Sequence, residues 1–72
     1  MSKYILQQST SEGWWVATDT LNGIVIRFKE RDFNDSQQVA YLPDTVPSDP
    51  LTIARQIREL TDWLVENHRN IL

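Results

Sequence analysis

The first forty residues of the chain alternate between apolar and polar positions with the two-residue period of β-strands. β-branched and aromatic residues are concentrated in these stretches, and polar turn-forming residues separate them. Four strands are therefore predicted, at Lys3 to Gln8, Trp14 to Thr20, Ile24 to Glu30 and Gln37 to Leu42. The segment between the last two is expected to be a polar loop, and no helix is expected before Pro43.

From residue 50 onward the period changes to that of an α-helix. Segment 43–49 contains two prolines and is predicted to be a linker, because each proline lacks a backbone N–H and restricts the residue before it. Asp49 followed by Pro50 is typical of a helix start, with Asp as the N-cap and Pro in the first turn. The helix is predicted to run to about Asn70. Its apolar stripe consists of Ile53, Ile57, Leu60, Leu64 and Ile71.

These elements predict an α+β fold: an antiparallel β-meander of three to four strands, followed by one long C-terminal amphipathic helix packed on one face of the sheet. The chain has 72 residues, which is the size of one domain. Within it, residues 1–42 form the meander, 43–49 the linker and 50–72 the helix. A domain this small buries little surface, and it has no cysteine for disulfides. Homodimerisation is therefore expected, since it buries further apolar surface.

Asn22-Gly23 is a strong signal for a two-residue hairpin loop. In that register Leu21 would face Ile24, and Trp14 would face Arg31. The side expected to form the core under the helix carries Trp15, Ala17, Asp19, Leu21, Ile24, Ile26 and Phe28, with Asp19 as a misfit near the rim. The opposite side provides the candidate binding surface: Trp14, Val16, Thr18, Arg27, Lys29 and Arg31.

This second side has two interpretations. A tryptophan beside a row of basic residues is a candidate binding surface. Alternatively, the long aliphatic stems of lysine and arginine only cover the apolar residues beside them, and the sequence favours this second interpretation.

Charge bears on the choice of partner. The net charge of −3 disfavours nucleic acid. Residues 1–31 carry four basic and three acidic side chains, whereas residues 32–50 carry four acidic and no basic ones. No stretch is long and apolar enough for a signal peptide or a membrane span, so a cytoplasmic protein without a membrane partner is expected.

Residues that could perform chemistry are scarce. His68 is the only histidine and is expected to have a packing or capping role. The loop from Asp32 to Ser36 begins like a calcium loop, but Gln37 stands where glycine is needed. No catalytic residue, cofactor or metal site is therefore predicted, and no enzymatic activity is expected.

The expected function is that of a small protein–protein interaction module whose partner is another protein or a second copy of itself. The alternative is a single-stranded nucleic-acid binder that uses the Trp14, Arg27, Lys29 and Arg31 side of the sheet. The order of four strands and a helix, from about Trp14 to Leu72, resembles the single-stranded-DNA-binding fold of transcriptional coactivators of the positive-cofactor-four type. This resemblance is one of layout and assigns no functional residue.

Overall fold

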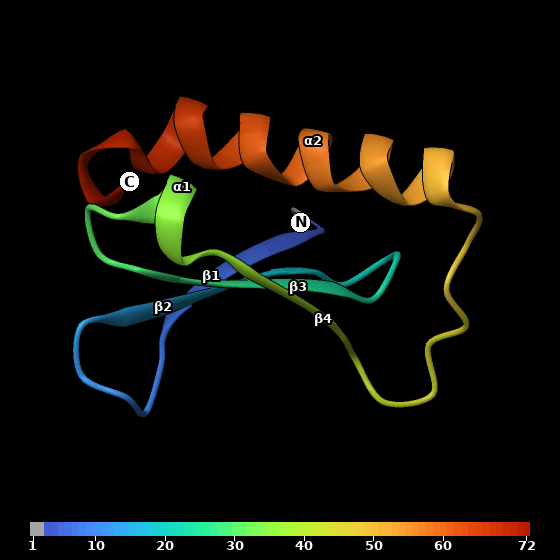
Figure 1. Ribbon diagram of the computed structural model, residues 1–72, viewed down its shortest axis with the longest axis horizontal. Coiled ribbons are helices and arrows are strands. Elements are labelled where there is room, and N and C mark those ends of the chain that lie inside the picture. The colour runs from blue at the N-terminus through green and yellow to red at the C-terminus, as the bar shows by residue number, and fades with distance from the viewer. Residues whose placement is uncertain (1–2) are drawn as a thin grey trace.

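Figure 1 shows the computed structural model of the protein, which describes residues 3–72. Four strands form one antiparallel sheet in the order β1-β2-β3-β4, and a long helix follows them. The elements are β1 (Tyr4–Gln8), β2 (Trp14–Asp19), β3 (Ile24–Lys29), α1 (Phe33–Ser36), β4 (Gln38–Tyr41), α2 (Pro50–His68) and the 3₁₀ turn η1 (Arg69–Ile71). The predicted meander followed by a C-terminal helix is confirmed.

The hairpin between β2 and β3 has a longer loop than predicted. Asp19 pairs with Ile24, so four residues rather than two form the turn. The predicted register is therefore wrong by two positions. Because side chains alternate with a period of two, a shift of two keeps every strand residue on its predicted face. Leu21 is the exception: it lies in the loop and is 73% exposed instead of facing the core.

Asp19 explains the longer loop. Its Oδ1 accepts hydrogen bonds from the backbone N–H groups of Leu21 and Asn22, both at 3.0 Å, and its Oδ2 accepts one from Asn22 Nδ2 at 2.8 Å. Gly23 closes the turn with φ of 73°, and its N–H donates to Asp19 O. Asp19 was expected near the rim, but its side chain is fully buried, because the loop supplies the partners that a buried carboxylate needs.

A single helical turn, α1, replaces the polar loop expected between β3 and β4, so the prediction of no helix before Pro43 is wrong. The hydroxyl of Ser36 donates to Asp32 O and accepts from the N–H of Lys29, which ties the turn to the end of β3. Phe33 is carried into the core by this turn and is only 6% exposed. Its ring meets that of Phe28 edge-on, with centroids 5.0 Å apart. A turn of four residues is too short to produce a periodic sequence signal.

Helix α2 covers one face of the sheet (Figure 1). It begins as predicted, with Asp49 as the N-cap accepting from the N–H of Thr52. Leu60 and Leu64 are fully buried on its apolar stripe and pack against the core side chains of the sheet. The core consists of Ala17, Ile26, Phe28, Phe33, Leu60 and Leu64.

The helix covers the sheet unevenly. Trp63 of α2 contacts Tyr4 of β1, with ring centroids 5.4 Å apart. On the other edge strand, Val39 pairs with Ile26 and Tyr41 pairs with Ile24, so both point to the helix side. Val39 is nevertheless 43% exposed and Tyr41 38% exposed. On the helix side of the sheet, α2 therefore leaves the β4 edge uncovered.

Candidate binding site on the open face of the sheet

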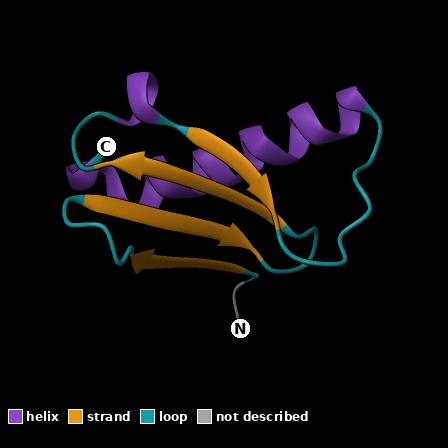
Figure 2. Ribbon diagram, turned by 60° about the horizontal axis from the view of Figure 1, so that its bottom comes forward, coloured by secondary structure: helices purple, strands orange, loops and turns teal. Residues whose placement is uncertain are grey.

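The face of the sheet opposite α2 is the candidate site, and we call it the open face. Figure 2 shows that the helices lie to one side of the sheet, so that among residues 3–72 no helix covers this face. The pairing of the strands defines its members. They are Ile5, Gln7, Trp14, Val16, Thr18, Val25, Arg27, Lys29, Gln38 and Ala40.

One row across the open face is largely apolar. It runs over all four strands through Ile5, Thr18, Val25 and Ala40, which pair in that order. Ile5 is 43% exposed, and Thr18 and Val25 are half-buried by their neighbours. The row provides β-branched surface that a partner could remove from water.

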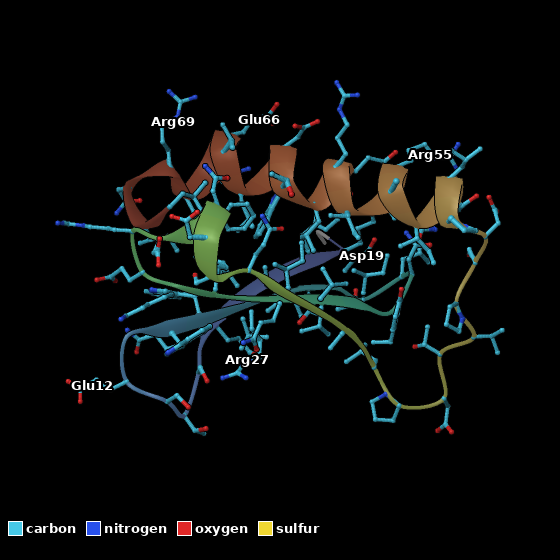
Figure 3. All side chains as sticks on the ribbon, viewed as in Figure 1. Glu12, Asp19, Arg27, Arg55, Glu66 and Arg69 are labelled. Carbon is cyan, nitrogen blue, oxygen red and sulfur yellow. The ribbon has the colours of Figure 1, made fainter. Side chains whose placement is uncertain are left out.

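The other end of the open face combines an aromatic ring with two cations. Trp14 pairs with Lys29, and the guanidinium of Arg27 lies over the Trp14 ring at 5.3 Å from its centroid. Figure 3 shows Arg27 pointing away from α2. None of the strand positions on this face carries a carboxylate. The open face is therefore basic, although the chain as a whole is acidic.

Five of the six predicted site residues lie together on this face: Trp14, Val16, Thr18, Arg27 and Lys29. Arg31 was expected opposite Trp14, but it lies beyond the end of β3, because the register differs by two positions. It has φ of 62°, and its backbone N–H donates to Ile71 O of η1. Arg31 is thus not part of the basic row.

The neighbouring tryptophans are turned to opposite faces, as the strand period requires. Trp15 pairs with Phe28 on the helix side, packs against the core and donates its indole N–H to Glu30 Oε1 at 3.2 Å. Trp14 pairs with Lys29 on the open face. The strand pairing therefore confirms the predicted faces. Both side chains are half-buried, so the degree of burial does not distinguish Trp14 from Trp15.

A surface cleft of about 340 Å³ lies at the turn between β1 and β2, next to the basic end of the open face. It is lined by Gln8, Ser9, Ser11, Glu12, Gly13, Trp14, Trp15 and Glu30. The sequence did not predict this cleft, because it depends on how the turn folds beside the two indoles. One of its two carboxylates, that of Glu30, accepts the indole N–H of Trp15 on the helix side of the sheet.

Titratable groups with shifted pKa values lie away from the open face. The pKa of Asp49 is lowered because the hydroxyl and the N–H of Thr52 donate to its carboxylate. The pKa of Lys3 is raised, first by its hydrogen bond to Tyr4 and then by the nearby charges of Asp19 and Glu59. Within residues 3–72 no three His, Cys, Asp or Glu side chains are grouped so that they could hold a metal ion.

His68 packs edge-on against Trp63, with ring centroids 5.1 Å apart. This is the packing role expected of it.

The chain matches no known family model, no curated protein and no solved structure. The layout resemblance to the single-stranded-DNA-binding fold is therefore not supported by a structural match. None of the helices formed by residues 3–72 combines the length and the apolar character that crossing a membrane requires.

Proposed function

We propose that this protein is a non-enzymatic binding module that docks an acidic region of another protein onto the open face. The observation that carries the proposal is the composition of that face. It holds a tryptophan, two cations and an apolar row, without a carboxylate at any strand position. Tryptophan and arginine are enriched where protein interfaces gain their affinity.

Charge distinguishes an acidic partner from a second copy. Two open faces stacked on each other would bring together two sets of Arg27 and Lys29 with no acid among the strand positions to compensate them. Like charges at an interface disfavour association, whereas opposite charges speed it and fix its orientation. An acidic protein surface supplies the opposite charge and leaves the apolar row available for contact.

The test is site-specific photo-crosslinking in an extract of the cells from which the chain comes. Benzoylphenylalanine replaces Gln7, which is exposed on the open face beside Val16, or Glu66, which is exposed on the outer side of α2 (Figure 3). The proposal predicts a discrete protein adduct from position 7 and none from position 66. Lys29→Glu should reduce the yield about tenfold, because it repels the acidic partner.

Three outcomes would contradict the proposal. An adduct of twice the chain's own mass would identify a second copy as the occupant. A nucleic-acid adduct would favour the alternative function, and equal yields from both positions would show that the open face is not a specific site.

Single-stranded nucleic acid is the second candidate, favoured by the Arg27 guanidinium over the Trp14 ring. Bases stack on aromatic rings while phosphates meet cations, and both elements are present. The net charge of −3 of the whole chain opposes it. A labelled oligothymidylate should then bind at about 50 mM salt, weaken at about 200 mM, and lose affinity in Trp14→Ala. Absence of binding at the lower salt concentration would exclude this function.

A further inference from the structure

The edge strand β4 (Gln38–Tyr41) has a second surface that the open face does not include. It pairs with β3 on one side only, and no other described strand lies along its outer side. All four of its side chains are exposed. Sheet edges are commonly protected by charged residues or proline within the strand, and β4 contains neither.

The outward-facing backbone groups of β4 can be assigned from the ladder. The N–H of Leu42 donates to Gly23 O, which makes Leu42 and Gly23 a hydrogen-bonded pair. Bonded and non-bonded pairs alternate along an antiparallel ladder. The N–H and C=O groups of Val39 and Tyr41 therefore point away from β3, toward the free edge.

The side chains of the same two residues are available as well. Val39 is 43% exposed and Tyr41 38% exposed on the helix side, where α2 leaves the edge uncovered. A strand added along β4 would thus gain backbone hydrogen bonds and, at alternate positions, apolar contacts.

Charge specifies the kind of strand that fits. Asp35 lies three residues before β4 and Asp44 three residues after it, and both are exposed. Residues 32–50 contain no basic side chain. Arg27 pairs with Gln38, but its guanidinium lies over Trp14 of β2, on the side away from β4. The ends of the edge are therefore acidic, and they would repel one another if two copies paired here.

We infer that β4 is a strand-addition site for an extended peptide with alternating apolar residues and basic flanks. The peptide pairs with the outward groups of Val39 and Tyr41, while its lysines or arginines meet Asp35 and Asp44. This site is separate from the open face, and its test is independent of the proposed function.

The test is an amide NMR titration of the whole chain with the peptide acetyl-KKVTVTVKK-amide and with the counterpart that has glutamate in place of every lysine. We expect saturable shifts at the amides of residues 37–42 with the basic peptide and at least tenfold weaker binding of the acidic one. Val39→Pro removes an outward N–H without removing a bond to β3, and it should abolish the shifts.

Gln8→Pro is the matched control on the opposite edge. The N–H of Thr20 donates to Lys3 O and the N–H of Ser9 donates to Trp14 O, so the alternation places the N–H of Gln8 outward on β1. This variant should bind the basic peptide as the unaltered chain does.

Four results would overturn the inference. They are no saturable shift with either peptide, shifts confined to the open face, equal affinity for the two peptides, and unchanged binding by a folded Val39→Pro variant. Sedimentation of the chain without peptide tests whether a second copy occupies the edge instead. A dimer that is lost in the Val39→Pro variant would assign the β4 edge to a second copy and would also overturn the inference.

Discussion

Truncation of Asp19 tests the account of the hairpin most sharply. The Asp19→Ala variant removes a fully buried carboxylate that accepts three hydrogen bonds from the four-residue loop. A hydrogen bond to a charged group contributes about 1.5–3 kcal/mol. Leu21 is 73% exposed, however, so water can reach part of the loop once the carboxylate is gone. We therefore expect a loss of about 2–4 kcal/mol in the free energy of unfolding.

This loss is large for the chain. A domain of 72 residues typically has an unfolding free energy of about 4–11 kcal/mol, at roughly 0.05–0.15 kcal/mol per residue. Urea denaturation followed by tryptophan fluorescence at pH 7 measures the change. Asp19→Asn keeps one acceptor oxygen and should lose less than Asp19→Ala.

Asp35→Ala is the matched control, because it removes an exposed carboxylate and changes the net charge equally. It should change the unfolding free energy by no more than about 0.5 kcal/mol. If Asp19→Ala were as harmless as this control, the carboxylate would not hold the loop, and the physical reason given for the four-residue turn would be wrong.

Three further predictions concern the core, the glycines and the helix start. Leu64→Ala should lower the free energy of unfolding, measured by urea denaturation, by about 2–5 kcal/mol, whereas Glu66→Ala on the exposed side of α2 should hardly change it. The reverse ranking would refute the assignment of the buried side of the helix. Gly13→Ala should lower the free energy of unfolding by about 1–2 kcal/mol, because Gly13 has a positive φ. Gly23→Ala should lower it further, because the added Cβ would also overlap the side chain of Thr45, and equal losses in the two variants would contradict this. Asp49→Asn should lower the melting temperature at pH 7. Because the pKa of Asp49 is lowered on folding, its charge stabilises the fold above pH 3.8. The difference in melting temperature between Asp49→Asn and the unaltered chain should therefore vanish as the pH falls through the folded-state pKa of Asp49. A difference that stays constant down to about pH 2 would refute this role of the charge.

The strands, their order and the faces of the residues in β2 and β3 could be predicted from the two-residue period and the hairpin signal. The hairpin register could not, because Asn22-Gly23 favours a two-residue loop while Asp19 captures the N–H groups of a longer one. The face assignments remained correct only because the error was an even number of residues. The Asp that precedes Asn-Gly by three residues was the signal that could have revealed the loop.

The candidate site was predictable to the same extent. The sequence correctly placed Trp14 and Arg27 on one face. It wrongly placed Arg31 there, because the predicted register differs from the observed one by two positions and β3 ends at Lys29. The exposed β4 edge could not be predicted, because periodicity gives the apolar side of α2 and not its lateral position over the sheet. The contact of Trp63 with β1 shows that position, and no local pattern encodes it.

The measurement that tests the central claim most directly is the yield of the Gln7 crosslink in the Trp14→Ala variant. Trp14 lies on the open face, so its loss should reduce the yield of the protein adduct about tenfold or more, which corresponds to about 1.4 kcal/mol of affinity. The variant should remain folded, whereas Trp15→Ala should lower the urea midpoint because Trp15 packs against the core. An undiminished adduct from folded Trp14→Ala protein would contradict the proposal that the open face binds the partner.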